Sequence, residues 1–166
     1  MYQKSVTLRY WDLIGGNQIG RWLFAKLVCW RVPYFSTISP SFLEYSDEVV
    51  VVAIKKKRSV TNHLGTIHVI AIANLCELAA GTLMEAGLVH SMRWIPKGMN
   101  ISYLLPANTH LTAKAIMPVV KEGEKMDVVV PVIVMDANKR EVVRADIIMY
   151  LSLIHISEPT RPERIS

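Results

Sequence analysis

The feature that most constrains the fold is the long apolar segment Ile67–Met84, which is rich in alanine and has few charged residues. Alanine favours the helix, and a helix that is apolar on all sides has to be buried. Thr66 is the predicted N-cap of this helix and Gly87 its predicted terminator. The rest of the chain is therefore expected to surround one central helix.

The residues after this helix change to the two-residue period of β-strands. Val49–Ile54, before the helix, is also a predicted strand because five of its six residues are β-branched. The later candidate strands are Ser91–Ile95, Asn100–Leu105, Leu111–Met117, Met126–Met135 and Glu141–Tyr150, and turn residues separate them. We expect an α+β fold in which an antiparallel sheet of about five to six strands wraps around the helix.

Residues 10–31 are predicted to form an N-terminal helix that ends at Pro33. Its large apolar residues recur every three or four positions, at Ile19, Trp22, Leu23, Leu27 and Trp30. We expect this stripe to pack against the domain; a peripheral membrane contact is the alternative, since its aromatic residues are mixed with basic ones. The segment is too polar for a stable membrane span. Residues 33–40 are a predicted loop in which Tyr34 and Phe35 plug the core.

Length and composition predict one domain, residues 1–150, with enough apolar sequence for a full core. The net charge of +5 suits an anionic ligand, an acidic membrane or nucleic acid, or reflects solvated lysines alone. Nucleic acid is not a predicted partner, because no binding motif accompanies the charge. Cys29 and Cys76 lie in apolar patterns, so we expect free thiols and a cytoplasmic protein.

The end of the chain has an unusual sequence. Residues 151–161 match the translation of a common transposon-end sequencing adaptor at all eleven positions. We therefore expect residues 151–166 to be a non-native tail, with a genuine strand extension through Ile156 as the alternative. His155 is given no functional role for this reason.

The candidate site begins with the turn before the central helix. Asn62, Gly65 and His68 are spaced three residues apart, and Glu77 follows nine residues after His68. Nine residues are two and a half helical turns, so the side chains of His68 and Glu77 lie on opposite sides of the helix. They can converge on one substrate only if a second subunit supplies one of them. The free N–H groups at the helix start can polarise a carbonyl oxygen.

The spacing Asn-x-x-Gly-x-x-His, followed by a helical acid, resembles the phenylacetate-pathway type of hotdog thioesterase. The resemblance implies that Glu77 activates water or attacks the thioester and that the Val69 N–H holds the oxyanion. His68 and Asn62 would complete the catalytic set, and Gly65, Thr66, Val69 and Asn74 would bind the substrate. Two departures are that Val69-Ile70 replaces the Gly-Gly of that motif and that Glu77 replaces an Asp.

A second resemblance covers nearly all of residues 10–150. The chain is similar to an uncharacterised hotdog family, a domain of unknown function. The shared segments are Gly20-Arg21-Trp22, Pro33-Tyr34-Phe35, Asn62 to His68, Asn74 to Gly81 and Arg93 to Met99. This resemblance implies a hotdog fold but does not specify a reaction.

Together these features predict an acyl-CoA thioesterase-like hydrolase, active as a homodimer or homotetramer. The substrate is an acyl-CoA or an acyl carrier protein thioester, with coenzyme A part of the substrate and no other cofactor. A non-catalytic acyl or lipid binder and an acyl-thioester dehydratase or hydratase are the alternatives. No metal site is predicted, because HExxH and CxxC motifs are absent from the sequence.

Each site residue also has a structural interpretation. His68 could bond backbone in the first helical turn, Asn62 could hold a turn, and Glu77 could be a partner of Asn74. Lys55 to Arg58 are either a solvated strand end or a contact for the phosphates of coenzyme A. Arg93 and Lys97 are a second candidate anion site.

Overall fold

The computed structural model describes residues 5–89, 91–121 and 123–153, and its centre is one six-stranded antiparallel sheet. The strands stand in the order β1-β2-β4-β5-β6-β3. Their bounds are β1 Ser41–Tyr45, β2 Val49–Ile54, β3 Met92–Tyr103, β4 Leu111–Ile116, β5 Met126–Asp136 and β6 Glu141–Leu153. Both ends of this order are free edges, and β3 forms one of them.

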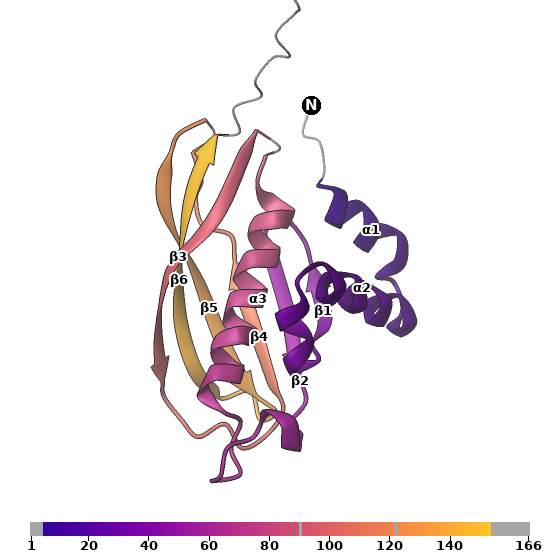
Figure 1. Ribbon diagram of the computed structural model, residues 1–166, viewed down its shortest axis with the longest axis vertical. Coiled ribbons are helices and arrows are strands. Elements are labelled where there is room, and N and C mark those ends of the chain that lie inside the picture. The colour runs from indigo at the N-terminus through magenta and orange to yellow at the C-terminus, as the bar shows by residue number, and fades with distance from the viewer. Residues whose placement is uncertain (1–4, 90, 122, 154–166) are drawn as a thin grey trace, which may run out of the picture.

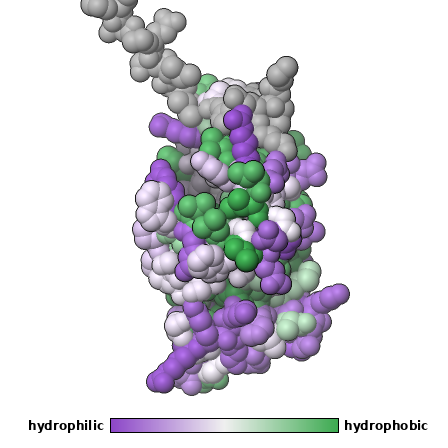
Figure 2. All heavy atoms as spheres, turned by 90° about the vertical axis from the view of Figure 1, so that its right-hand side faces the viewer, coloured by the Kyte–Doolittle hydropathy of each residue, from purple (hydrophilic) through white to green (hydrophobic). Residues whose placement is uncertain are grey.

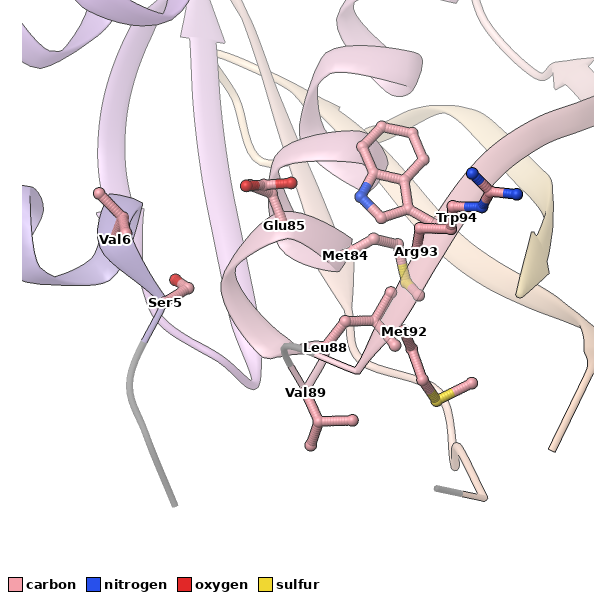
Figure 3. Close-up of a pocket in the computed structure, with 9 residues that line it drawn as sticks. All are labelled: Ser5, Val6, Met84, Glu85, Leu88, Val89, Met92, Arg93 and Trp94. Atoms are coloured by element: carbon pink, nitrogen blue, oxygen red, sulfur yellow. The ribbon is translucent and has the colours of Figure 1, made fainter. Parts of the chain in front are cut away.

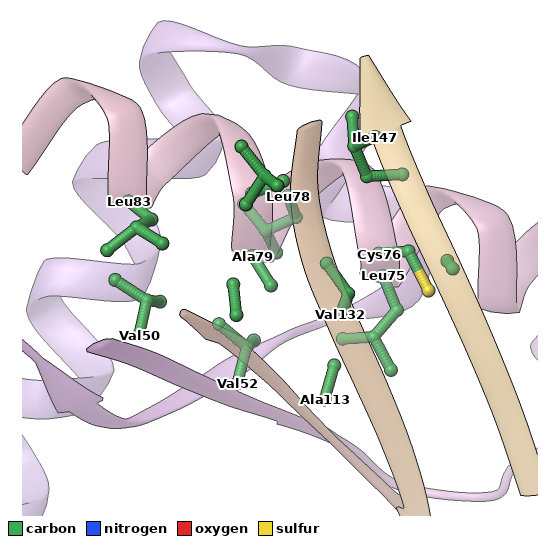
Figure 4. Packing of buried hydrophobic residues seen from close by; sticks show 14 of the residues in the cluster. Val50, Val52, Leu75, Cys76, Leu78, Ala79, Leu83, Ala113, Val132 and Ile147 are labelled. Carbon is green, nitrogen blue, oxygen red and sulfur yellow. The ribbon is translucent and has the colours of Figure 1, made fainter. Parts of the chain in front are cut away.

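The sheet curls around the helix α3, Val69–Gly87, which lies in its concave face (Figure 1). Buried and exposed residues alternate along β2, β4 and β5, so each strand turns one row of apolar side chains toward the helix. Leu75 and Ala79 of α3 pack against Val52, Ala113 and Val132 from three of these strands (Figure 4). A sheet wrapped around one long helix is the predicted hotdog architecture, and the prediction is confirmed.

The boundaries of the central helix differ from the prediction. α3 begins at Val69, and its N-cap is His68 instead of Thr66. Residues 66 and 67 continue the preceding turn, because the Ile67 N–H donates to the carbonyl oxygen of Ala107 at 2.9 Å. By length and composition α3 could cross a membrane, but 61% of it is buried inside the domain, so its apolar residues form the core.

Two helices, instead of the single one predicted for residues 10–31, precede the sheet. α1 spans Val6–Ile14 and α2 spans Gln18–Arg31. The break falls at Gly15-Gly16-Asn17, where the Asn17 side chain accepts a hydrogen bond from the Gly20 N–H at 2.9 Å and so starts a new helix.

The apolar stripe of α2 that was predicted to pack against the domain faces away from it. The buried residues of this helix are Gly20, Phe24 and Ala25. The stripe Ile19, Trp22, Leu23, Leu27 and Trp30 is exposed. The prediction that it packs against the domain is therefore wrong, because small residues and one phenylalanine make the close contact instead.

An aromatic cluster joins the two N-terminal helices to the sheet. Phe24 lies at the centre, with its ring centroid 5.1 Å from those of Trp11 and Phe42 and 4.9 Å from that of Tyr45. The Tyr45 hydroxyl lies 3.1 Å from the carbonyl oxygen of Thr82 in α3. The cluster therefore connects α1, α2, β1 and the central helix.

Several local predictions also need correction. The predicted loop 33–40 contains the 3₁₀ helix η1, Pro33–Ile38; Tyr34 is 62% exposed, and only Phe35 packs against the core. β1 was not predicted. The two predicted strands on either side of Pro96-Lys97-Gly98 are one strand, β3, with a bulge between Pro96 and Gly98.

The predicted tail is only partly described. Residues 151–153 extend β6 and pair with Met92 to Trp94 of β3, and Leu151 is buried. Residues 154–166 lie outside the described part of the chain. The adaptor origin of the tail stays a prediction.

Candidate functional site

The turn that carries Asn62 and Gly65 is held by its own side chains. Asn62 Oδ1 accepts from the N–H groups of Leu64 at 3.0 Å and Thr66 at 3.2 Å, and its Nδ2 donates to Thr66 Oγ1 at 2.8 Å. Gly65 adopts φ +77°, a left-handed conformation that favours glycine, with open space around it. Asn62 and Thr66 therefore shape this turn, and Gly65 leaves its surface accessible.

His68 closes the start of α3. Its Nδ1 accepts a hydrogen bond from the Ile70 N–H at 3.1 Å, and its own N–H donates to the carbonyl oxygen of Val60 at 2.8 Å. A neutral imidazole that accepts through Nδ1 carries its proton on Nε2. The capping bond therefore fixes the tautomer, and the exposed ring can offer an Nε2–H donor to a ligand.

Val69 supplies the first N–H of the helix. The first N–H groups of any helix have no partner inside it, and the helix dipole makes this end positive. His68 accepts hydrogen bonds from the Ile70 N–H through Nδ1 and from the Ile72 N–H through its carbonyl oxygen. The Val69 N–H has no acceptor among the described residues. The Val69 carbonyl accepts from the Tyr103 hydroxyl at 3.3 Å, which places the helix start beside the end of β3.

Glu77 lies on the side of α3 that faces β3. Gly81, one turn later on the same face, touches Trp94 of β3: a Cβ at Gly81 would lie 3.0 Å from Trp94 Cη2. Val69, two turns before Glu77, touches Tyr103 at the other end of the same strand. The half-buried Glu77 side chain thus stands between two contacts of α3 with the edge strand.

The structure does not bring His68 and Glu77 together within one chain. No hydrogen bond joins them in the described part of the chain, as the helical spacing leads one to expect. A substrate that touches both would need a second α3.

Asn74 does not orient Glu77, contrary to one structural interpretation of its sequence position. Its Nδ2 donates to Thr37 Oγ1 of η1 at 3.1 Å, and the residue is 5% exposed. Asn74 Oδ1 is buried with no partner among the described residues. Asn74 therefore ties η1 to the central helix, and its predicted contact with the substrate stays a prediction.

The edge strand β3 is long and exposed. It has twelve residues, and Ile95, Met99 and Tyr103 are 53%, 39% and 47% exposed. A long apolar edge is a template for pairing with another strand, and proteins rarely leave one uncovered. Sequence reasoning missed Trp94 and Tyr103 as neighbours of the site, because the apolar alternation of this strand changes phase at the bulge between Pro96 and Gly98.

The basic loop Lys55 to Arg58 lies near the start of α3, whereas Arg93 lies near its other end. β2 stops at Ile54, so Lys55 to Arg58 leave the sheet and form a loop followed by a short 3₁₀ turn. The Lys56 N–H donates to His110 Nδ1 at 2.9 Å, which fixes this loop. Of the second candidate anion site, Lys97 is paired with Asp127, and Arg93 Nε donates to Ser152 Oγ.

A hollow of about 430 Å³ lies at the other end of α3 (Figure 3). The end of α3, the start of β3 and the start of α1 line it, through residues that include Glu85, Arg93 and Trp94. Arg93 of the second candidate anion site is among them, but none of the predicted catalytic or substrate-binding residues is. The predicted catalytic residues therefore lie apart from this hollow, along the side of α3 that borders β3.

Both cysteines are free thiols; Cys76 is buried, and Cys29 is partly exposed. Burial raises the pKa of the Cys76 thiol to about 12, and burial also raises the pKa of Cys29. Within residues 5–89, 91–121 and 123–153, no three His, Cys, Asp or Glu side chains gather in a way that could hold a metal ion.

Comparisons with known proteins place the chain in a family. The family model described as domain of unknown function DUF4442 matches residues 20–151. The crystal structure of the structural-genomics target APC5556 is 33% identical, with a TM-score of 0.78, and the match covers 89% of this chain and 98% of that one. No curated protein matches significantly.

More distant structures share the fold. A probable thioesterase of Pseudomonas aeruginosa is 16% identical, with a TM-score of 0.70 over 77% of this chain and 92% of its own. A thioesterase of Haemophilus influenzae is 10% identical, with a TM-score of 0.66 over 76% and 87%. The chain is a member of the DUF4442 family, and its hotdog fold is shared with proteins named as thioesterases.

Proposed function

We propose that this protein is an acyl-thioester hydrolase whose active site forms between two subunits paired along β3. The observation that carries the proposal is the position of Glu77: a half-buried carboxylate on the face of α3 that borders an unpaired apolar edge strand. Pairing of two β3 edges would cover Ile95, Met99 and Tyr103 and would set a second α3 opposite the first.

In this arrangement the thioester carbonyl lies at the start of one α3, where the Val69 N–H and the helix dipole stabilise negative charge on its oxygen. Glu77 of the other subunit takes a proton from water, and the water oxygen bonds to the carbonyl carbon. The C–S bond then breaks, the thiolate takes the proton held by Glu77 and leaves as the thiol, and the acyl group is released as the acid. The alternative is direct attack by the Glu77 carboxylate on the carbonyl carbon, which expels the thiolate and forms an anhydride that water then hydrolyses.

The remaining residues of the site would bind and orient the substrate. The capping bond fixes the tautomer of the His68 imidazole, so its Nε2–H is a hydrogen-bond donor, and Gly65 leaves room for the substrate to approach. The cationic loop Lys55 to Arg58 lies beside the same helix start and would bind the phosphates of coenzyme A. Coenzyme A is the proposed carrier on this ground.

The decisive experiment compares wild type with Glu77→Gln on a panel of acyl-CoAs, with thiol release as the readout. Glu77→Gln keeps the shape of the side chain and is expected to lower kcat by at least about a hundredfold. Glu85→Gln, two turns later on the same helix, is the matched control and should hydrolyse as wild type. Equal rates for Glu77→Gln and wild type would remove the assignment.

A mixing experiment tests the two-subunit site. Glu77→Gln and His68→Ala are each expected to be inactive, but a heterodimer of the two restores one intact site. Unfolding and refolding an equal mixture should recover roughly a quarter of wild-type activity, since half of the dimers carry one good site of two. Recovery of no activity would mean that each site belongs to one chain.

A non-catalytic acyl binder is the second candidate, favoured by the replacement of the motif's Gly-Gly by Val69-Ile70. Their side chains are 41% and 56% exposed and would narrow the approach to the helix start. An acyl ligand that co-purifies with the wild-type protein, with no turnover of any thioester, would favour this function.

A further inference from the structure

The outer face of α2 is unusual for a surface helix, because it carries five large apolar side chains. They are spaced three or four residues apart, as on one side of a helix, and are Ile19 (79% exposed), Trp22 (60%), Leu23 (43%), Leu27 (42%) and Trp30 (80%). Single exposed apolar residues are normal, whereas a continuous row marks a surface that binds something.

α1 extends the same surface. Val6, Tyr10 and Leu13 follow one another by four and three residues and are 57%, 53% and 79% exposed. Figure 2 shows this side of the molecule, where apolar side chains gather in the middle of the face and polar side chains lie below and around them. We call the exposed apolar residues of α1 and α2 together the outer surface.

The charges of the two helices are almost all positive. Arg9, Arg21, Lys26 and Arg31 stand against the single acid Asp12. Lys26 lies within the apolar row, with its Nζ 5.7 Å from the centre of the Trp22 ring. Tryptophan, tyrosine and basic residues on an amphipathic helix are the composition of helices that lie in a membrane interface.

From this we infer that α1 and α2 bind the surface of an anionic lipid bilayer, with the outer surface at the boundary between headgroups and acyl chains. The exposed apolar side chains leave water, and Trp22 and Trp30 lie at headgroup level. The Lys26 stem lies along the apolar row while its ammonium reaches the lipid phosphates. The protein stays peripheral, because no residue of these helices enters far enough to span the bilayer.

A polar hollow beside the row supports an anionic headgroup as the partner. It has a volume of about 140 Å³, and Lys26 and three serines, Ser36, Ser39 and Ser41, are among its lining residues. Lys57 reaches the same place, since its Nζ donates to Ser39 Oγ at 2.6 Å. Lys26 thus borders a recess next to the apolar row, and Lys57 is bonded to one of its serines, which suits a phosphate.

The charges also argue against a second copy of this chain as the partner. Lys26 stands near the middle of the row. If two copies packed their rows against each other about a two-fold axis, the ammonium group of Lys26 in one copy would face that of Lys26 in the other. Like charges in a dry contact are costly. The apolar row of α2 is also on the opposite side of the domain from β3, so it stays free when two β3 edges pair (Figure 1). Val6 at the start of α1 is the exception, since it lines a hollow together with the start of β3.

Vesicle flotation with the full chain tests the inference. The probes are vesicles of phosphatidylcholine alone and vesicles that also contain about a third phosphatidylserine, at low and high salt. We expect flotation with the anionic vesicles at low salt and much less with the neutral ones. Failure of the wild-type protein to float with anionic vesicles at low salt would overturn the inference.

Two pairs of variants locate the contact. Ile19→Gln with Trp30→Gln removes apolar area and should lower the partition coefficient by at least about tenfold, while Val119→Gln, at an apolar residue that is 91% exposed elsewhere, should not change it.

Charge reversal is the second pair. Lys26→Glu with Arg31→Glu should lower anionic-vesicle binding by more than about tenfold, and Lys125→Glu should have a small effect. Unchanged binding of both double variants would overturn the inference. So would a wild-type oligomer, measured by light scattering, that becomes smaller in Ile19→Gln/Trp30→Gln, because the outer surface would then be an interface between copies.

Discussion

Which face of α2 packs against the domain can be tested by one pair of neighbouring substitutions. Phe24 is 2% exposed and contacts three aromatic rings at centroid distances of about 5 Å, whereas Leu23, the residue before it, is 43% exposed. Phe24→Ala therefore removes the centre of the aromatic cluster. Leu23→Ala removes three carbon atoms from the outer surface.

The magnitude follows from the buried area. A buried phenylalanine hides at least about 150 Å² of surface. At about 25 cal/mol per Å² this is worth roughly 4 kcal/mol. Three edge or tilted ring contacts are lost as well, and a cavity remains, so Phe24→Ala should lower the free energy of unfolding by about 3–5 kcal/mol. Leu23→Ala should change it by less than about 1 kcal/mol.

Urea denaturation at one fixed protein concentration measures both values, since the stability of an oligomer depends on concentration. The expected result is a much lower midpoint for Phe24→Ala and a nearly unchanged one for Leu23→Ala. If Leu23→Ala were the more destabilising of the two, α2 would pack through its apolar row. The outer surface, and with it the membrane inference, would then be lost.

Two further substitutions test contacts elsewhere in the fold. Gly81→Val places a Cβ 3.0 Å from Trp94 Cη2 and should lower the free energy of unfolding, measured by urea denaturation, by about 1–3 kcal/mol. Trp94→Ala in the same chain should recover part of that loss. If the effects of the two substitutions on the free energy of unfolding were strictly additive, the contact would be contradicted. The backbone N–H of Arg140, and to a smaller extent its side chain, hold the pKa of Asp136 below the ordinary 3.8. The charged carboxylate therefore stabilises the fold above pH 3.8, and this stabilisation is lost as pH falls through the lower pKa of the folded protein. Asp136→Asn should therefore lower Tm at pH 7, and the deficit should shrink as pH falls below 3.8; a deficit that is constant with pH would refute this.

The parts of the fold that sequence predicted are those whose neighbours are dictated by periodicity. α3 has to be buried because it is apolar on all sides, and β5 and β6 were predicted as strands from their apolar residues and the turns around them. β3 was divided in error because Pro96 and Gly98 are typical turn residues. An edge strand tolerates them, since Pro96 needs no partner on the open side and the bulge absorbs the extra residue.

The candidate site divides in a similar way. The turn at Asn62 could be predicted because its hydrogen bonds join residues at most four positions apart. The cap of α3 was assigned to Thr66, although the Thr66 side chain is held by Asn62 and His68 takes the capping position. The neighbours of Glu77 could not be predicted, because Trp94 and Tyr103 come from a strand whose place in the sheet is fixed only by the tertiary fold.

α2 shows most plainly what periodicity leaves open. Its apolar row predicts a one-sided helix, but not which partner covers that side. The domain takes the narrow face, where Gly20 and Ala25 permit close approach and Phe24 enters the aromatic cluster. The five larger side chains remain outside, together with three on α1 and a lysine within the row. A row of this size would be costly to leave in water, so its exposure here is itself evidence for a partner, and the positive charge around it selects an anionic one.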